Sequence, residues 1–213
     1  YLLILVIGIV LLPEASTLRC YDCIPEVTGT CNETTTCPTE KNQCAAVNLV
    51  SRIYNDYCFI AGGSEVFNGT GKTCVLPEEC GQHSVNFGVF RTVVTSKCCN
   101  TDLCNTQPAP EPSETNPNGR KCFTCVGQMC NTTLNCLGTE DSCISATVST
   151  GGQNVTLKGC ASKVLCTNKE FLRAIELLGA EVSCCQGDSC NSSSSTSAGL
   201  MLLVAPLISL VLS

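Results

Sequence analysis

The chain of 213 residues has a formal net charge of −6, one histidine, no tryptophan and 21 cysteines. Its 12 basic residues form no basic run, which argues against nucleic-acid binding. Catalysis by side chains needs a base together with a nucleophile or a metal, and the neighbours of the single histidine, His83, form no known catalytic pattern. We therefore expect a protein that is not an enzyme, with His83 on a surface, no cofactor and no catalytic metal.

The start of the chain has the pattern of a secretory signal. Residues 2–12 are an uncharged apolar run, followed by Pro13 and by small residues at 15–17. We place a signal peptide at residues 1–17. A membrane anchor is the weaker alternative, because a spanning helix needs about 20 residues; a buried strand is another. The sequence starts at Tyr1 without Met or a basic segment, so we expect it to be N-terminally incomplete.

The cysteines after this segment form two blocks of ten with nearly the same spacing. Successive steps are 3, 8, 6, 7, 30, 6, 18, 1 and 5 residues in the first block and 3, 5, 6, 7, 17, 6, 18, 1 and 5 in the second. Each block closes with the pattern CCxxDxCN, at residues 98–105 and 184–191. Independent placement of cysteines would not produce this agreement, so the chain contains an internal repeat. In a secreted chain these cysteines form disulfides.

A CxxC opening, ten cysteines and a closing CCxxDxCN resemble the three-finger superfamily of the urokinase receptor and the lymphocyte-antigen proteins. The resemblance covers residues 18–105 and 120–191. It implies an all-β, disulfide-rich fold of two tandem three-finger domains with these boundaries, in which short β-hairpin fingers extend from a cysteine knot. It also implies that Asn105 and Asn191 hydrogen-bond to the backbone of the knots.

Sequence alone does not give the disulfide connectivity. The family pattern, carried over to this chain, implies five disulfides in the first domain: Cys20–Cys44, Cys23–Cys31, Cys37–Cys74, Cys80–Cys98 and Cys99–Cys104. In the second domain it implies Cys122–Cys143, Cys125–Cys130, Cys136–Cys160, Cys166–Cys184 and Cys185–Cys190. Cys58 has no counterpart in the second block and is left unpaired, so we expect either a free thiol or a disulfide-linked dimer.

The two CxxC pairs also have alternative readings. Cys20 with Cys23, and Cys122 with Cys125, would suit a thioredoxin-type redox site or a zinc site. A thioredoxin-type pair belongs at a strand-to-helix junction of a cytosolic chain, and zinc needs unpaired thiolates. Neither condition fits a secreted, disulfide-rich chain, so we expect no metal site here.

The fingers should be β-hairpins, since parallel strands need long crossover connections. The longest finger is 44–74 of the first domain, and its aromatic residues are our candidate ligand contacts, because exposed aromatics are enriched at interfaces: Tyr54, Tyr57, Phe59 and Phe67. Packing of these aromatics between the two domains is an equally open alternative. Residues 87–96, rich in Val, Phe and Thr, are expected to form a strand of the third finger.

Residues 106–119 contain four prolines, which predict an extended, semi-rigid linker with a turn at Asn118-Gly119. In the second domain, apolar and polar residues alternate on both sides of Gly151-Gly152, which predicts a hairpin over 143–160. The segment 170–178 consists of helix formers with apolar residues near helical spacing. We expect a short helix there, with an irregular loop as the alternative.

The end of the chain resembles a glycolipid-anchor signal, which we place at 192–213. Small residues at 191–195 offer attachment positions, and the apolar run 200–213 would be the tail that is removed. This run is short for a spanning helix, and no Lys or Arg follows it. Five sequons are present. We expect Asn191 to serve the knot, and glycans on the other four: Asn32, Asn68, Asn131 and Asn154.

These patterns favour a binding module over an enzyme. We expect a glycolipid-anchored glycoprotein on the extracellular side of the plasma membrane that binds a protein ligand through its finger faces. The urokinase receptor has three such domains and this chain has two, so binding of urokinase does not carry over. The run 154–160 is also similar to the two-domain secreted phospholipase inhibitors, which makes a secreted phospholipase inhibitor the alternative. The sequence does not identify the ligand.

Overall fold

β-Strands form nearly all of the regular structure in the part of the chain that the structure describes. The computed structural model describes residues 17–24, 31–54, 64–113, 116–126, 129–150, 153–168 and 181–192. Within these ranges lie the strands β1 to β11 and two short 3₁₀ turns, η1 (Pro77–Glu79) and η2 (Lys163–Cys166). The predicted all-β class is confirmed. The helix expected at 170–178 lies outside the described residues.

The chain divides into two compact units whose boundaries cut across the cysteine blocks. The first unit comprises Tyr1–Leu49, Asn68–Gln82 and Val94–Pro112. The second comprises Val50–Phe67, His83–Val93 and Ser113–Ser213. The second unit therefore includes finger segments of the first block together with the whole second block.

The first block contributes six strands: β1 (Arg19–Tyr21), β2 (Thr34–Thr36), β3 (Gln43–Ile53), β4 (Ser64–Val75), β5 (Gly81–Asn86) and β6 (Phe90–Cys99). β1 and β2 form a small antiparallel sheet of their own. β3 and β6 are rich in Val, Thr and Ile, residues that fit a pleated surface buried on one or both faces. Five residues of each strand are buried, including Val50 of β3 and Val93 of β6.

The second block contributes five strands: β7 (Pro117–Val126), β8 (Met129–Leu137), β9 (Ser142–Thr150), β10 (Gln153–Ala161) and β11 (Glu181–Cys185). β7 pairs with β8 in a two-stranded antiparallel sheet. β9 pairs with β10 as the predicted hairpin, with β11 antiparallel on its other side. Ile144 and Ala146 of β9 are buried, as the alternation predicts. The turn glycines of this hairpin lie outside the described residues.

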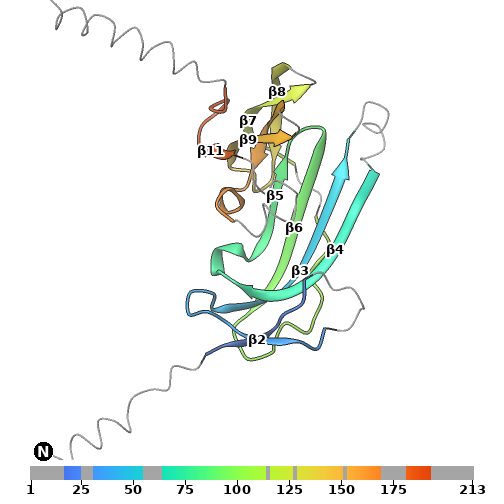
Figure 1. The fold of residues 1–213 in the computed structure, drawn as a ribbon, viewed down its shortest axis with the longest axis vertical. Helices are drawn as coiled ribbons and strands as arrows, with labels where there is room; N and C mark the ends of the chain where they lie inside the picture. The colour runs from blue at the N-terminus through green and yellow to red at the C-terminus, as the bar shows by residue number, and fades with distance from the viewer. Residues whose placement is uncertain are drawn as a thin grey trace, which may run out of the picture. The chain divides into compact units, whose positions relative to one another are not determined.

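The largest sheet has seven strands in the order β11-β9-β10-β5-β6-β3-β4. Figure 1 labels β5, β6, β3 and β4, the four strands that the first block contributes to it. β6 therefore has a neighbour on each side, β5 and β3, while β4 and β11 end the order. Ser51 and Thr92, from β3 and β6, join hydroxyls at 2.8 Å. This hydrogen bond satisfies the hydroxyl of Thr92, which is 1% exposed.

The strand predicted over 87–96 begins and ends three residues later in the structure, as β6. β6 begins at Phe90, because residues 87–89 turn the chain between β5 and β6. The N–H of Phe87 donates to the carbonyl oxygen of Phe90 at 2.9 Å. Gly88 has a φ of 81°, in the left-handed region, and its N–H donates to Oδ1 of Asn86. A left-handed glycine is a feature of tight hairpin turns, and sequence composition alone did not locate it.

The turn predicted at Asn118-Gly119 is instead a bulge inside β7. The pairing of β7 with β8 shifts in register between Pro117 and Lys121. Gly119 has a φ of 93°, and Oδ1 of Asn118 accepts the N–H of Arg120 at 2.9 Å. A glycine in the left-handed region is one way of adding an extra residue to a strand without ending it.

The first part of the linker lies against the first unit's strands. Asn48 of β3 donates from Nδ2 to Glu111 at 3.4 Å. Thr95 of β6 donates from Oγ1 to the carbonyl oxygen of Pro110. Residues 110–111 are therefore held by side chains of two neighbouring strands. Composition had predicted a semi-rigid spacer, and the structure adds this docking.

Within the second unit, β10 approaches β5 very closely. The paired residues are Cys160 with Asn86 and Ala161 with Val85. A Cβ atom added at Gly159 would lie 1.9 Å from the carbonyl oxygen of Asn86. Only glycine fits there without moving one of the two backbones.

A buried ion pair also holds the second unit together. Nε of Arg91 lies 2.9 Å from Oε1 of Glu140, and these side chains are 9% and 0% exposed. The hydroxyl of Ser84 donates to the same oxygen at 2.7 Å. The other carboxylate oxygen accepts the N–H of Leu137 at 2.8 Å. The carboxylate is therefore paired and hydrogen-bonded at both oxygens, as burial of a charge requires.

We expect Gly159→Ala to lower the free energy of unfolding by about 1–3 kcal/mol, the usual cost of forcing extra atoms into a packed site. Denaturant unfolding without reductant, followed by circular dichroism, measures the change. Ser183→Ala, on the exposed side of β11, is the matched control and should have little effect. Equal stabilities of the two variants would show that the β5–β10 contact tolerates a Cβ.

We expect Arg91→Met to cost about 3–5 kcal/mol, because it leaves the Glu140 carboxylate buried without its partner. The double variant Arg91→Met/Glu140→Met should recover much of this loss. Arg19→Met removes an exposed pair with Asp102, whose side chains are 54% and 59% exposed, and should cost about 0–1 kcal/mol. The same unfolding measurement applies, and similar losses for the two single variants would contradict the role assigned to the buried pair.

Candidate functional site

Disulfides hold the base of each cysteine block. In the first block they join Cys20–Cys44, Cys23–Cys31, Cys37–Cys74, Cys80–Cys98 and Cys99–Cys104. In the second they join Cys122–Cys143, Cys125–Cys130, Cys136–Cys160, Cys166–Cys184 and Cys185–Cys190. These are the pairs that the family resemblance implies. The bonds of the first block all lie in the first unit and those of the second block in the second unit.

Two disulfides form the centre of each base. In the first block four buried cysteines pack as one cluster: Cys20, Cys37, Cys44 and Cys74. In the second block the corresponding cluster is Cys122, Cys136, Cys143 and Cys160. Three sulfurs in each cluster lie close enough together to resemble a metal site. Every one of them belongs to a disulfide, so none offers the thiolate that a zinc site requires.

The aspartate of each closing octet binds the backbone where the block begins. Oδ1 of Asp102 accepts the N–H of Arg19 at 3.0 Å. In the second block, Oδ1 of Asp188 accepts the N–H of Lys121 at 3.2 Å. The residue after each aspartate, Leu103 or Ser189, has a φ of 55°. The N–H of each donates back to the carbonyl oxygen of Arg19 or Lys121 at 2.7 Å.

The side chain of the asparagine that ends each octet joins its own segment to strands that lie far away in the sequence. Oδ1 of Asn105 accepts the N–H of Tyr21, and Nδ2 donates to the carbonyl oxygens of Tyr21 and Ala45. Oδ1 of Asn191 accepts the N–H of Phe123, and Nδ2 donates to the carbonyl oxygens of Phe123 and Ile144. Both side chains are buried. These hydrogen bonds are the role that the resemblance implies for the two residues.

The sequons differ in their structural setting. Asn32, Asn68 and Asn131 are exposed. Asn154 lies in β10, and its side chain is outside the described part of the chain. Asn191 is 6% exposed, and its amide nitrogen is committed to backbone carbonyl oxygens. Among these five, Asn191 is the one whose described surroundings leave no room for a glycan.

Exposed apolar side chains occur near the ends of finger strands in the second unit. Ile53 of β3, Phe67 of β4 and Val89 of the β5–β6 turn are 46%, 50% and 45% exposed. The N–H of Tyr54 donates to the carbonyl oxygen of Val89 at 2.7 Å, which brings the end of β3 beside that turn. β4 is the neighbour of β3 in the sheet. Ile53, Phe67 and Val89 are called the finger-end residues below.

The sequence-based candidates are only partly represented in this group. Phe67 is half-exposed, and Tyr54 is partly buried with its backbone bonded to Val89. Tyr57, Phe59 and Cys58 lie outside the described residues. Ile53 and Val89 were missed because aromatic residues were the criterion. An apolar residue next to a glycine turn, such as Val89 after Gly88, was the available signal.

Two exposed apolar residues also occur in the second block. Met129 at the start of β8 and Val155 in β10 are 67% and 52% exposed. In the sequence, Val155 and Leu157 alternate with Thr156 and Lys158, a pattern that predicts Val155 on the apolar face of the hairpin. In the structure Lys158 is buried, at 5% exposure, and Val155 is not. The faces of β10 are therefore decided by its neighbours β5 and β9 and not by its own polarity pattern.

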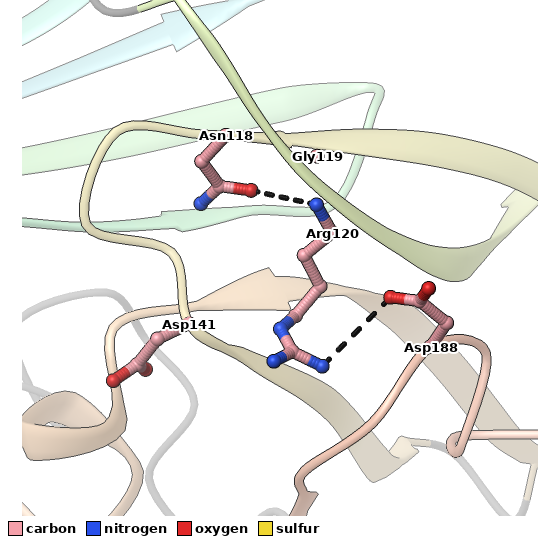
Figure 2. A pocket seen from close by; sticks show the side chains of 5 residues that line it. All are labelled: Asn118, Gly119, Arg120, Asp141 and Asp188. Atoms are coloured by element: carbon pink, nitrogen blue, oxygen red, sulfur yellow. Dashed lines mark hydrogen bonds and ion pairs between the residues drawn. The ribbon is translucent and has the colours of Figure 1, made fainter.

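A shallow, open depression of about 410 Å³ lies at the base of the second block, lined by Asn118, Gly119, Arg120, Asp141 and Asp188 (Figure 2). Figure 2 shows the side chain of Arg120 pointing toward Asp188, and the Nη1–Oδ1 distance is 3.8 Å. Asp141 accepts the N–H of Lys163 at 2.8 Å. The carboxylates of Asp188 and Asp141 therefore bond to backbone N–H groups of β7 and of the start of η2.

His83 does not line this depression. It lies in β5 and is partly buried.

None of the helices formed by the described residues has the length and apolar character needed to cross a membrane.

Comparison with known proteins gives the same two regions that the cysteine repeat marks. The family model described as "snake toxin and toxin-like protein" matches residues 18–105 and 120–191. The urokinase plasminogen activator surface receptor of Bos taurus is 34% identical over 104 residues, which are 45% of this chain and 32% of the receptor. This chain spans 31% to 39% of the length of the urokinase receptors that it matches.

A second relative covers more of the chain. A phospholipase A2 inhibitor of the gamma type from Gloydius brevicaudus siniticus is 27% identical over 179 residues, which are 73% of this chain and 88% of the inhibitor. Among solved structures, mouse TEX101 aligns with a TM-score of 0.25 and 14% identity, covering 73% of this chain and 87% of that one. Because the family model matches both cysteine blocks, the chain belongs to the family of snake toxins and toxin-like proteins.

Proposed function

We propose that this chain is a non-catalytic, cell-surface glycoprotein, held by a glycolipid anchor, that binds a protein ligand through the ends of its fingers. Its relatives are receptors and inhibitors of the toxin-like family, proteins whose names describe binding. The cysteines at the base of each block are joined in disulfides, so none of them is a thiolate that could act as a nucleophile. Association through a surface is the function that such a scaffold supports best.

The observation that carries the proposal is the exposure of the finger-end residues. Ile53, Phe67 and Val89 each leave about half of their side-chain surface in water, although each is large and apolar. Exposed apolar groups that gather on one part of a protein commonly mark an interaction site. Phe67 is the one aromatic of the three, and aromatic residues are enriched among interface anchors. We infer that a protein ligand covers this part of the second unit.

The anchor is a separate part of the proposal. Residues 191–195 are small, 192–199 are polar or small, and 200–213 form an apolar run. This is the order of attachment site, spacer and tail in a glycolipid-anchor signal. Attachment at 192–195 would leave Asn191 free for its hydrogen bonds to Phe123 and Ile144.

A secreted phospholipase inhibitor is the second candidate. It is favoured by one specific finding, which is that this chain covers 88% of the Gloydius inhibitor. The run 154–160 that resembles these inhibitors lies in β10, where Val155 is exposed. A phospholipase would then contact the second block, whereas the leading proposal uses fingers of the first. The two candidates therefore predict different contact residues.

The ligand test compares two exposed apolar residues of similar exposure. We first cross-link the ectodomain on living cells, identify the captured protein by mass spectrometry, and measure its binding by surface plasmon resonance. Phe67→Ser should weaken binding by about tenfold or more, which corresponds to about 1.4 kcal/mol or more. Val155→Ser should leave it nearly unchanged. The second candidate would be supported instead if Val155→Ser, and not Phe67→Ser, lost binding. It would also be supported if the chain inhibited a phospholipase and Val155→Ser abolished that inhibition.

The anchor test uses intact cells that express the chain. Phosphatidylinositol-specific phospholipase should release the protein into the medium, because a cleaved glycolipid leaves no apolar tail in the membrane. Treatment with heat-inactivated phospholipase is the control. Protein found in the medium before treatment would favour the secreted inhibitor, and protein extracted only by detergent would contradict both forms of the proposal. We propose that Cys58 is either a free thiol or the link of a disulfide dimer, and a non-reducing gel of the same sample distinguishes the two.

A further inference from the structure

The finger formed by the end of β5 and the start of β6, residues 84–91, is called the β5–β6 finger below. It belongs to the first block, yet Val85 and Phe87 in it are each 1% exposed. Phe87 packs on Phe90 of the same finger, and its carbonyl oxygen accepts a hydrogen bond from Oγ1 of Thr124 in β7 at 2.6 Å. A Cβ added at Gly88 would lie 2.9 Å from that hydroxyl oxygen. The second block therefore lies directly against the turn of this finger.

Backbone hydrogen bonds join the same finger to β10 and the residue that follows it. Two residues of β5 pair antiparallel with the last two residues of β10. Ser84 and Ser162 extend this ladder, because the N–H of Ser162 donates to the carbonyl oxygen of Ser84 at 2.9 Å. The N–H of Ser84 donates in turn to Oγ of Ser162 at 3.0 Å. Adding a strand to a sheet is a common way for one segment to bind another, since backbone groups supply the affinity.

Opposite charges meet at this contact and are buried there. Arg91 belongs to the finger and Glu140 to the second block, and both are buried. Nη2 of Arg91 donates to the hydroxyl of Ser84 at 3.2 Å, and that hydroxyl donates to the carboxylate that Arg91 also meets. A buried carboxylate needs its partners. The second block is therefore matched to a finger that carries an arginine and a hydroxyl at these positions.

All of these contacts lie inside the second compact unit, which contains both residues 84–91 and residues 113–213. Each of the ten disulfides joins two cysteines of the same block. As far as the described cysteines are concerned, the backbone of the linker 106–119 is thus the covalent connection between the blocks. The finger contact is a second, non-covalent connection.

We propose that the second block is a docking site for the β5–β6 finger of the first block, and that it keeps hold of this finger after the linker is cut. The finger also carries Val89, whose carbonyl oxygen accepts the N–H of Tyr54, so docking holds the end of β3 as well. Docking within the chain needs no ligand. Its failure and the failure of the proposed function are therefore separate results.

The test uses the full chain expressed in cultured animal cells, with an affinity tag before Leu18 and a site for a sequence-specific protease inserted after Ser113. The protein is extracted in mild detergent, cut, and captured by its tag at a series of dilutions. The fraction of the second block that stays bound gives the Kd of the two halves. Wild-type halves should stay together after cutting, and SDS without reductant should separate them. Halves that part on cutting, or that part in SDS only after reductant is added, would overturn the proposal.

Two substitutions in the second block show whether the finger contact is what holds the halves together. Gly159→Ala places a Cβ 1.9 Å from the carbonyl oxygen of Asn86 in the finger, and should raise the Kd about tenfold or more. Ser183→Ala, on the exposed side of β11, is the matched control and should leave the Kd unchanged. Mapping of Cys136–Cys160 without reductant reports whether the second block of each variant is folded. A folded Gly159→Ala variant with the Kd of wild type would overturn the proposal.

Thr124 provides a milder test that applies even if Gly159→Ala fails to fold. Thr124→Val keeps the shape of the side chain but removes the hydrogen bond to the carbonyl oxygen of Phe87, and should raise the Kd severalfold. Thr124→Ser keeps the hydroxyl and should bind the finger more tightly than Thr124→Val does. Equal Kd values for the Val and Ser variants would contradict docking at this turn.

Discussion

The structure depends on covalent closure at the base of each cysteine block. In each base, two disulfides whose cysteines are almost fully buried pack against each other and take the place of a larger apolar core. Domains of this size bury little apolar surface, so an apolar core alone gives them only marginal stability. A native disulfide in a small secreted domain contributes about 2–5 kcal/mol. Because several strands converge on one small base, their backbone groups meet there away from water. Asn105 bonds to three of these groups and Asn191 to four.

The two bases are alike to the level of single hydrogen bonds, whereas the segments that leave them are not. Asp102 and Asp188 accept the corresponding backbone N–H groups, and Leu103 and Ser189 share a φ of 55°. The sixth cysteine follows the fifth by 30 positions in the first block and by 17 in the second. Because the same base holds fingers of different length, the base can stabilise the fold while the fingers differ in what they bind. We therefore attribute ligand choice to the fingers, where the exposed apolar residues lie.

Polar groups are buried beside apolar ones where the fingers of the second unit pack together. Arg91 and Glu140 are buried against each other, and Ser84 bonds to the same carboxylate. Such a pair contributes little net stability compared with an apolar contact, but removing one partner is costly. Gly159 adds a steric condition, since β10 and β5 approach too closely for any side chain. With their backbones held by these contacts, the fingers can leave Phe67 and Val89 in water.

The sequence by itself determined the repeat, the all-β class and, through the family resemblance, the disulfide pairs and the role of the two asparagines. The repeat follows from local spacing, because a cysteine pattern survives changes in loop length and side-chain polarity, whereas the pairs and the asparagine role are what the resemblance implies. It also predicted the hairpin that became β9 and β10, whose alternation is local. Only the tertiary structure decided that Lys158 is buried while Val155 is exposed, that Arg91 meets Glu140, and that Asn118 and Gly119 form a bulge. Each of these depends on a neighbouring strand that is distant in the chain, and such pairings leave no periodic signal in the sequence of either partner.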